Sequence, residues 1–346
     1  MKKTAFLLAA GILALSLFMP ACNKKQESEQ GSNFTVYAPD GAPALAIAGM
    51  MSEDFSIAYG NKTSKLDCKV VSSSVIATKV TNKDTDKNAD FCVLPLTAAS
   101  KILGNGEKYG LLGAVTHGNL YLISKNTEVS FTAENLTSLV GKTIGVLQIN
   151  EVPGLVLKTA LQKRGVAWQE LKNDVGRDAT KVNLVAISGP ADLGVIEADC
   201  YLLGEPAASA QKGKGYSIVG SLQEIYGGVN GYPQAVLVGK KSLLDEDGLA
   251  AAFAKAVAES AAWLASADGA TIVSRVTASL EDSNYATMLK APLLTAEVLG
   301  RCSVRFEQAK DCKTAVEEFL NSAAAVNPQM AVLPQEAFYY TADMGV

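Results

Sequence analysis

The sequence has few of the residues on which common catalytic and metal sites depend. His117 is the single histidine, and none of the six cysteines belongs to a Cys-x-x-Cys pair. Structural zinc is held by four cysteine or histidine ligands at short, regular spacings, so no metal site is expected. The chain also lacks the nucleophile elbow of hydrolases. We therefore expect no cofactor, no metal and no catalytic residue.

Clustered positive charge is equally scarce. The chain carries 31 lysines and arginines against 35 acidic residues, for a net charge of -4, and no basic run exceeds two residues. A protein that tracks nucleic-acid phosphates needs a basic patch with interleaved aromatics, so nucleic acid is not an expected partner. With 346 residues, 48% of them hydrophobic, the chain can instead build a substantial core and is suited to two lobes.

The one long apolar run lies at the N-terminus. Basic Met-Lys-Lys precedes about fifteen apolar residues, which is short for a membrane span but typical of a secretory signal. Pro20-Ala21-Cys22 then resembles a bacterial lipobox, although Met19 stands where leucine is usual. We expect a lipoprotein signal peptide over 1–21, a lipidated Cys22 and a flexible tether over 22–33. An ordinary cleavable signal with an incidental cysteine is the alternative.

The remaining cysteines have two possible uses. Cys302 and Cys312 are close enough in sequence to close a small loop by a disulfide. The other three lie in apolar, strand-like runs and are expected to be small buried side chains: Cys68, Cys92 and Cys200.

Short apolar runs alternate with helix-like stretches from residue 34 onward. The predicted strands span 34–39, 66–73, 90–96, 143–148, 182–188 and 199–206. The predicted helices between them span 43–59, 74–82, 97–104, 153–164 and 189–197. Apolar strands that alternate with helices indicate parallel sheets buried on both faces. The predicted fold class is therefore α/β.

Two further β-rich runs, 111–126 and 231–241, divide this series. They predict two α/β lobes joined by two β crossovers. The signal peptide and the tether precede the first lobe. The predicted domains are 34–122 with 234–346 for lobe one, and 123–233 for lobe two.

The last part of the chain is predicted to be helical. Residues 245–267 are alanine-rich with apolar residues at helical spacing, and more helices are expected to about residue 325. The apolar and aromatic content of residues 327–346 predicts that this terminal segment packs on a lobe.

The turns that follow the predicted strands share a chemistry. They span 39–44, 71–75, 94–98, 147–154, 187–192 and 203–208, and they combine small residues and proline with a hydroxyl, amide or carboxylate. In an open α/β sheet such turns line the ligand crevice. Proline fits the first helical turn, and small residues expose backbone N–H groups to a ligand. We therefore predict a ligand site between the lobes.

The candidate ligand residues lie on these turns and on the two crossovers. They are Asp40, Gly41, Ala42, Pro43, Ser73, Ser74, Leu96, Thr97, His117, Gly118, Asn119, Gln148, Asn150, Glu151, Pro153, Gly154, Glu205 and Tyr232. Several have a purely structural alternative: Asp40 and the serines as helix caps, or His117 as a hydrogen-bonded structural residue.

The motifs together resemble the type II periplasmic solute-binding proteins of ABC importers, in the branch that binds sulfonates, nitrate and thiamine pyrimidines. The resemblance covers roughly residues 33–325. It rests on PDGAPALAIAGM, ADFCVLPLTAASKIL, YGLLGAVTHGNLYLIS, LVGKTIGVLQ and LLGEPAAS. It implies a two-lobed periplasmic-binding-protein type II fold and a monomer held on the periplasmic or cell-surface face of a bacterial membrane.

That resemblance also implies a function. The chain is expected to capture a small solute between its lobes and deliver it to a permease and ATPase. Because no arginine lies on the six turns to pair an anion, a neutral or heteroaromatic solute is expected, such as a pyrimidine or vitamin precursor. A sulfonate or another anion, an enzyme on the same fold resembling a pyrimidine synthase or a dehydratase, and a surface adhesin or sensor remain alternatives.

Overall fold

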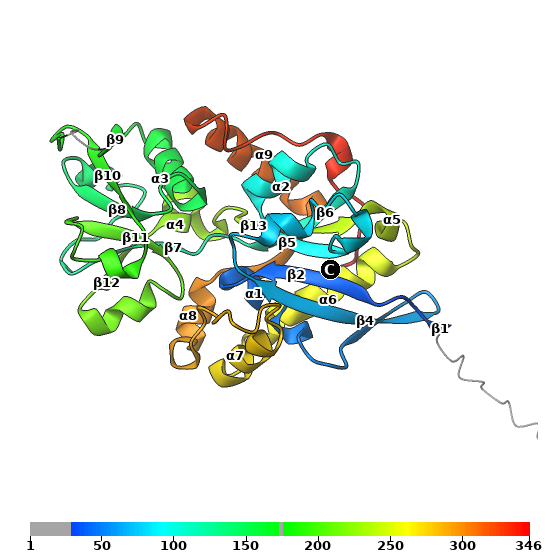
Figure 1. Ribbon diagram of the computed structural model, residues 1–346. Helices are drawn as coiled ribbons and strands as arrows, with labels where there is room; N and C mark the ends of the chain where they lie inside the picture. The colour runs from blue at the N-terminus through cyan, green and yellow to red at the C-terminus, as the bar shows by residue number, and fades with distance from the viewer. Residues whose placement is uncertain (1–28, 173–175) are drawn as a thin grey trace, which may run out of the picture.

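Two α/β lobes form the molecule, and the chain crosses between them twice. The computed structural model describes residues 29–172 and 176–346. Figure 1 shows lobe two, in green, to the left of lobe one, which contains both the early and the late parts of the chain. The predictions for the signal peptide, Cys22 and most of the tether lie outside the described residues.

Lobe one is built on a mixed sheet of order β1-β4-β2-β5-β13-β6-β14, with β3 paired to β4. Its strands are β1 Glu29–Gln30, β2 Phe34–Pro39, β3 Ser56–Tyr59, β4 Lys62–Val71, β5 Phe91–Pro95, β6 Tyr109–Thr116, β13 Ala235–Lys240 and β14 Val304–Gln308. Strands β4, β2 and β5 run parallel, whereas β13 is antiparallel to both β5 and β6.

Lobe two is built on a second sheet of order β12-β7-β11-β8-β10-β9. Its strands are β7 Leu120–Ser124, β8 Thr143–Leu147, β9 Trp168–Glu170, β10 Val182–Ile187, β11 Cys200–Gly204 and β12 Ser217–Ser221. Strands β9, β10, β8 and β11 are parallel, and β7 is antiparallel to β11. The predicted lobe boundary after residue 122 falls inside β7, all of which pairs in this second sheet.

The helices cover the faces of these sheets. The α-helices are α1 Ala42–Leu45, α2 Leu96–Leu103, α3 Val152–Lys163, α4 Leu222–Gly227, α5 Lys241–Leu244, α6 Leu249–Trp263, α7 Gly269–Ala278, α8 Ala296–Arg301 and α9 Ala309–Val326. Short 3-10 turns are η1 Ala48–Met50, η2 Ile76–Lys79, η3 Thr85–Lys87, η4 Leu136–Leu139, η5 Pro190–Asp192, η6 Ser209–Lys214, η7 Gly228–Asn230, η8 Ala291–Leu293 and η9 Glu336–Phe338.

Strand β5 shows why its sequence is apolar throughout. Phe91 and Val93 join the core cluster under α6, while Cys92 and Leu94 join the cluster on the opposite face of the sheet. Successive strand side chains point to opposite faces, so a strand covered on both sides needs apolar residues at every position. The ring of Phe253 from α6 stacks on Phe91 at 3.7 Å between centroids.

The second core cluster is shared by both lobes. It joins the α9 face of lobe one to the interior of lobe two. Helix α9 packs against both β6 and α3. Tyr232 stacks on Phe319 of α9 at 5.5 Å, and Tyr226 of α4 meets the same ring edge-on at 5.8 Å. Apolar contacts therefore hold the lobes together on the α9 side.

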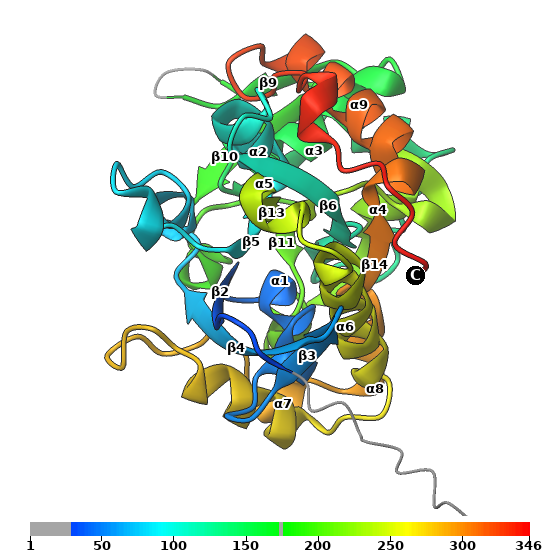
Figure 2. The same cartoon turned by 90° about the vertical axis from the view of Figure 1, so that its right-hand side faces the viewer.

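The predicted packing of the C-terminal segment is confirmed. Phe338, Tyr339 and Met344 are buried, and the Tyr340 N–H donates to the Leu111 carbonyl at 2.9 Å. Figure 2 shows this segment, in red, running beside α9 and β6 on the side of lobe one.

Three of the predicted helices are wrong in extent or type. The predicted helix 43–59 is only α1 and η1, followed by strand β3, whose alternating burial suits an edge strand on β4. Gly49 lies in η1, and glycine is needed there because α6 packs directly on this backbone: a Cβ would lie 2.9 Å from Ser260 Cα. The predicted helices 74–82 and 189–197 are single 3-10 turns.

The C-terminal region and the cysteines also depart from expectation. Strand β14 interrupts the part of the chain predicted to be helical. Cys302 and Cys312 are free, buried thiols, so the possible disulfide is not formed. They belong to different core clusters, on opposite faces of the sheet. Burial raises the pKa of each thiol to about 12. Cys68, Cys92 and Cys200 are buried as predicted.

Candidate functional site

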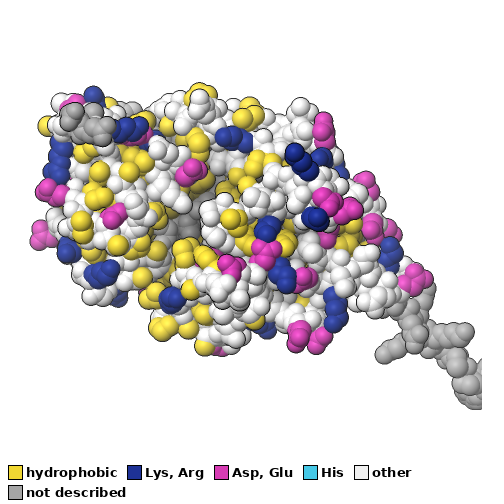
Figure 3. Space-filling model, viewed as in Figure 1, with side chains coloured by type: hydrophobic (Ala, Val, Ile, Leu, Met, Phe, Trp, Pro, Cys, Tyr) yellow, Lys and Arg dark blue, Asp and Glu magenta, His cyan; other side chains and the backbone are white. Residues whose placement is uncertain are grey.

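The crossovers place the carboxyl ends of the parallel strands of both lobes opposite each other. At the first sheet, Ala235 pairs with both Pro95 and Thr116, so β5 ends where the chain leaves and re-enters lobe one. At the second sheet, Leu120 pairs with Gly204, so β11 ends at the same crossover. Parallel strands of one sheet end at one edge, and the predicted turns follow these ends. Figure 3 shows the surface hollowed between the lobes.

The turn after β2 is fixed within lobe one. Asp40 is 2% exposed. Its Oδ1 accepts from the Gly41 N–H at 2.8 Å and the Thr287 hydroxyl at 2.7 Å. Its Oδ2 accepts from the Met288 N–H at 2.7 Å and the Tyr285 hydroxyl at 3.1 Å. The carboxylate thus holds the 285–288 loop against the start of α1.

Gly41 is required by the backbone of the same turn. Its φ of 100° lies in a region that side chains rarely adopt. The helix that follows has Pro43 in its first turn, as the sequence pattern indicates, and Ala42 is buried beneath it.

The other two turns of lobe one differ in exposure. Ser73 and Ser74 are exposed after β4, and the Ser74 hydroxyl lies 2.9 Å from that of Ser72. Leu96 and Thr97 are buried in the first turn of α2. Among the described residues, no side chain caps α2, so the N–H groups of its first turn need partners from elsewhere. The Leu96 N–H donates to the Gln234 carbonyl at 2.9 Å.

The turn before α3 is an exposed part of lobe two. Gln148, Asn150 and Glu151 are exposed, and no side chain caps the helix. Gln148 has a φ of 54°. Pro153 lies in the first turn, and a Cβ on Gly154 would lie 2.0 Å from the Ile149 carbonyl oxygen. Glycine is therefore needed where the chain folds back into α3.

Glu205, after β11, connects the two lobes. Its carboxylate accepts from the Ser209 N–H at 3.0 Å and the Ser209 hydroxyl at 2.6 Å, both within lobe two. The same carboxylate accepts from Arg301 Nε at 2.6 Å, and Arg301 belongs to α8 of lobe one. The Tyr121 hydroxyl of β7 adds a bond to the Arg301 carbonyl at 3.0 Å.

The charge state of Arg301 follows from these contacts. Burial lowers the pKa of its guanidinium, but hydrogen bonds to Glu205 and Glu297 outweigh burial, and the pKa is raised. Arg301 therefore stays charged, with both acids as partners. The Glu205 side chain is fully buried and that of Arg301 is 23% exposed.

Side-chain amides form hydrogen bonds across the first crossover. Asn119 donates to the Glu205 carbonyl at 3.2 Å and accepts from the Gln234 amide at 3.0 Å. Gly118, with a φ of 89°, leaves room for neighbouring side chains, because a Cβ there would lie 2.7 Å from Gln223 Cβ. Gln223 in turn accepts from the Leu120 N–H at 3.0 Å.

Two predicted residues at the crossovers are engaged elsewhere. His117 is buried, and its Nε2 lies 2.9 Å from Glu307 of β14. Burial lowers the pKa of His117 more than the hydrogen bond to Glu307 raises it. Tyr232 is 1% exposed and stacks within the shared core, where its hydroxyl has no partner among the described residues.

The structure thus brings some predicted residues together and separates others. Asn119 and Glu205 meet at the crossover, whereas the exposed serines and the 148–151 turn stand on opposite lobes. Sequence reasoning missed Arg301, Gln234 and the Asp40 partners in the 285–288 loop. Arg301 carries no local signal, because it lies at a helix end nearly one hundred positions from Glu205.

Residues 29–172 and 176–346 contain no group of three or more histidine, cysteine or acidic side chains placed to hold a metal ion. None of the helices in these ranges is both long and apolar enough to cross a membrane.

Comparison with known proteins places the fold. No protein-family model matches the chain, and no curated protein does. Among solved structures, it is similar to an ABC transporter from Parabacteroides distasonis, with a TM-score of 0.67 and 20% identity over 89% of this chain and 99% of that one. It is also similar to the periplasmic aliphatic sulphonate binding protein SsuA from Escherichia coli, with a TM-score of 0.58 and 11% identity over 88% and 92%.

A third similar structure is the ligand binding component of an ABC-type import system from Staphylococcus aureus, with zinc bound. The TM-score is 0.52 and the identity 12%, over 90% of this chain and 96% of that one. Identities this low establish the fold alone. The chain has the two-lobed α/β fold of periplasmic binding proteins, as the sequence predicts.

Proposed function

We propose that the protein is the substrate-binding component of an ABC importer. It captures a small solute between its lobes and delivers it to a membrane permease with its ATPase. The observation that carries this proposal is the placement of the carboxyl ends of β5 and β11 at the same pair of crossovers. Ligands of open α/β sheets bind outside such strand ends, and here the strand ends of both lobes face one space.

The proposed mechanism is closure of the lobes on the solute. A solute that contacts both lobes favours the closed arrangement by its differential affinity for it. The crossover residues 116–120 and 230–235 are the segments that would absorb the rotation. The Glu205–Arg301 pair already spans the lobes and would bias their relative placement.

We propose a neutral or heteroaromatic solute, such as a pyrimidine or vitamin precursor. Arg301 is the cation nearest the Glu205 turn, and two carboxylates neutralise it. The exposed amides of Gln148 and Asn150 can donate to and accept from the edge of a heterocycle. A sulfonate or another anion is the alternative, supported by the starts of α2 and α3, which no side chain caps.

We also propose that the protein is not an enzyme. Its candidate acid–base groups are Glu151, Glu205 and His117, and they do not converge. Glu151 is exposed, Glu205 is committed to Arg301, and His117 is bonded to Glu307. General acid–base catalysis needs such groups within hydrogen-bond reach of one substrate.

Native mass spectrometry tests the binding role. The full chain is purified in mild detergent from cells grown in rich medium, and bound molecules are then released by denaturation. A stoichiometric small molecule is expected, and its mass separates a heterocycle from a sulfonate. Ser73→Trp, on an exposed turn between the lobes, should lose it, whereas Ser56→Trp, exposed on β3, should retain it. A chain that stays empty through a broad thermal-shift panel of solutes would favour the adhesin or sensor alternative.

The lipid anchor is a separate part of the proposal. We propose that Cys22 is lipidated and holds the protein on a bacterial membrane, on its periplasmic or cell-surface face. All five other cysteines are buried, free thiols. A thiol count in denaturant should therefore give five if Cys22 is modified and six if it is not.

A further inference from the structure

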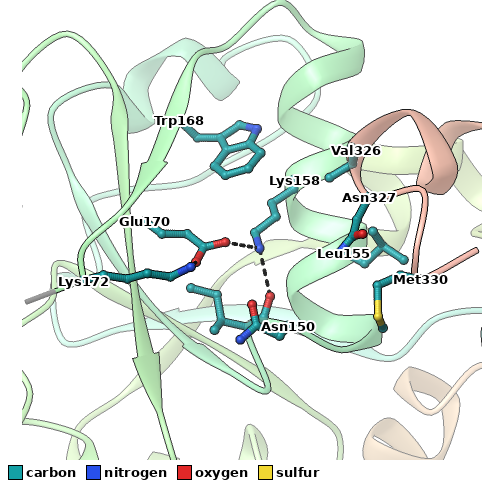
Figure 4. A pocket seen from close by; sticks show the side chains of 10 residues that line it. Asn150, Leu155, Lys158, Trp168, Glu170, Lys172, Val326, Asn327 and Met330 are labelled. Atoms are coloured by element: carbon teal, nitrogen blue, oxygen red, sulfur yellow. Dashed lines mark hydrogen bonds and ion pairs between the residues drawn. The ribbon is translucent and has the colours of Figure 1, made fainter.

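A cavity lies where lobe two meets the end of α9, and it borders the predicted turn before α3, which contributes Ile149 and Asn150 to its lining. Its volume is about 200 Å³. Lobe two supplies one wall, from the turn before α3, from α3 itself and from β9, whereas lobe one supplies the other from the end of α9 and the residues after it. The lining residues are Ile149, Asn150, Leu155, Lys158, Trp168, Glu170, Lys172, Val326, Asn327 and Met330. Figure 4 shows their side chains around the space.

A buried lysine makes the lobe-two wall rigid. Lys158 is 7% exposed, and its ammonium donates to Glu170 Oε1 at 2.6 Å and to the Ile149 carbonyl at 3.0 Å. The same ammonium lies 5.3 Å from the centre of the Trp168 ring. A charged group this deep is stable only when its bonds are made, so these contacts fix Trp168 and Glu170 in place.

The charges that line the cavity do not balance. Glu170 pairs through Oε1 with Lys158 and through Oε2 with Lys172, at 2.6 and 2.7 Å. One carboxylate therefore faces two ammonium groups, which leaves an excess of one positive charge among the lining residues. Burial raises the pKa of Glu170, but the two lysines outweigh it and the pKa is lowered. Lys172 is 68% exposed, so its remaining N–H donors are accessible.

The opposite wall adds a donor and apolar surface. Asn327 uses its side-chain oxygen to accept from the Gln329 N–H at 3.1 Å, which leaves its amide NH2 without a partner among the described residues. Val326 and Met330 add an aliphatic and a thioether group to this wall, and Leu155 and Trp168 add an aliphatic group and an indole from lobe two.

We propose that this cavity is a second binding site, for a small organic acid whose carboxylate meets Lys172 and the Asn327 amide and whose apolar body lies against Trp168 and Met330. The excess cation and the free amide recognise the oxyanion, and the indole and thioether faces cover a flat body. The proposal is distinct from the one for the interlobe solute, because the four residues that would hold the acid lie outside the predicted turns, and only the cavity lining at Ile149 and Asn150 is shared.

Trp168 can report binding directly. The chain has two tryptophans, and the other, Trp263, lies on α6 of lobe one. In the full chain carrying Trp263→Phe, Trp168 emission is followed at constant ionic strength against three probes: benzoate, benzyl alcohol and inorganic sulfate. A saturable change is expected with benzoate. Benzyl alcohol, which lacks the charge, and sulfate, which lacks the apolar body, should each bind at least about tenfold more weakly.

Two variants locate the site. Lys172→Met should weaken benzoate binding about fivefold or more, whereas Lys212→Met, which removes an exposed charge elsewhere in lobe two, should leave it unchanged. Val326→Phe should fill the cavity and abolish the response. Circular dichroism and the urea midpoint of each variant verify that it is folded.

Two results would overturn the proposal. One is the absence of any saturable response up to about 10 mM benzoate in the folded parent chain. The other is a response that survives both Lys172→Met and Val326→Phe, because benzoate would then bind elsewhere, for instance at the turns that follow β5 and β11. Equal affinity for benzyl alcohol would also reject the organic-acid class.

Discussion

Asp40 in lobe one and Glu205 in lobe two are buried acids in equivalent places, yet they have different partners. Each follows the carboxyl end of a parallel strand and begins a turn that the sequence predicts to bind ligand. Asp40 takes all four of its hydrogen bonds from lobe one. Glu205 divides its carboxylate between Ser209 of its own lobe and Arg301 of the other.

The difference lies in the kind of donor as well as its origin. Asp40 is held by neutral hydroxyl and N–H groups, which stabilise a loop of its own lobe. Glu205 is held in part by a guanidinium, and removing one partner of an ion pair of low exposure is costly because the other charge stays buried without compensation. The first acid fixes the shape of one wall of the interlobe space, and the second fixes how the two walls sit together.

The largest expected effect comes from Asp40→Asn. The amide NH2 replaces an oxygen that accepts from one hydroxyl and one backbone N–H. The hydroxyl can turn and accept from the amide, but the buried N–H loses its partner. We expect the free energy of unfolding of lobe one to fall by about 2–4 kcal/mol. Urea unfolding checks this in single-tryptophan chains, since Trp263 reports lobe one and Trp168 reports lobe two.

Asp67→Asn is the matched control for this change. Asp67 lies on β4 of the same lobe but is exposed, and Lys69 is its one ion-pair partner among residues 29–172 and 176–346. The urea midpoint of lobe one should therefore not move in Asp67→Asn. If Asp40→Asn also left the lobe-one transition in place, Asp40 would not be anchoring the 285–288 loop and would be available to a solute.

The second effect is the coupling between Glu205 and Arg301. Arg301→Met leaves a buried carboxylate without its cation and should cost more than Glu205→Gln. In a double-mutant cycle we expect a coupling energy of about 1–3 kcal/mol. Unlike Asp40→Asn, the Arg301 variant should shift the transitions of both tryptophans, because the pair belongs to both lobes.

Glu297→Gln tests whether the second acidic partner of Arg301 contributes to the stability of the lobes. Glu297 also pairs with Arg301, but its side chain is 78% exposed, and exposed pairs contribute little. It should leave both transitions unchanged. A Glu205–Arg301 coupling below about 0.5 kcal/mol would mean that the lobes do not depend on this contact.

The sequence predicts the fold well where burial is two-sided. Strands β5, β8 and β11 are predicted within a residue or two, because apolar runs between turns leave little choice. Strand β3 and the shortness of α1 are missed, because they depend on β4 and on the approach of α6 at Gly49. Tertiary packing overrides local helix preference there.

The candidate site is predicted less completely, for a related reason. Glu205 and Asn119 are recognisable because each sits at a strand end beside a crossover. Their partners are not, since Arg301 and Thr287 come from regions far along the chain that carry no pattern of their own. Local patterns predict which turns face the space, but not which side chains are already occupied.

A smaller interlobe effect is expected from Tyr121→Phe. This change removes one hydroxyl that donates across the lobes to the Arg301 carbonyl, at 3.0 Å. The loss should be about 0.5–1.5 kcal/mol in urea unfolding. Tyr340→Phe is the control, because the Tyr340 hydroxyl makes no hydrogen bond among the described residues. Equal effects from the two variants would show that Tyr121 acts through packing rather than through Arg301.

The smallest effect is a pH dependence that arises at the crossover. Burial lowers the pKa of His117 below its ordinary value of 6.5, Glu307 opposes the shift through its hydrogen bond, and Arg305 adds to it. The unfolded chain therefore takes up the proton more readily than the folded one. Stability is unaffected well above pH 6.5, and it falls as the pH drops through 6.5 towards the lower folded pKa.

His117→Gln tests this directly, since glutamine can still donate to Glu307 and cannot be protonated. Between about pH 7.5 and about pH 5.5, the parent should lose more free energy of unfolding than the variant, by at most about 1.4 kcal/mol in total, because the unfolded histidine takes up its proton only as the pH falls through 6.5. The pKa of Glu307 is also lowered, mainly by its bond to His117, but its contribution is lost only below its ordinary value of 4.5. Parallel curves would mean that the ion pair with Glu307 balances burial. Because His117 is the single histidine of the chain, a difference in this window can be assigned to the first crossover alone.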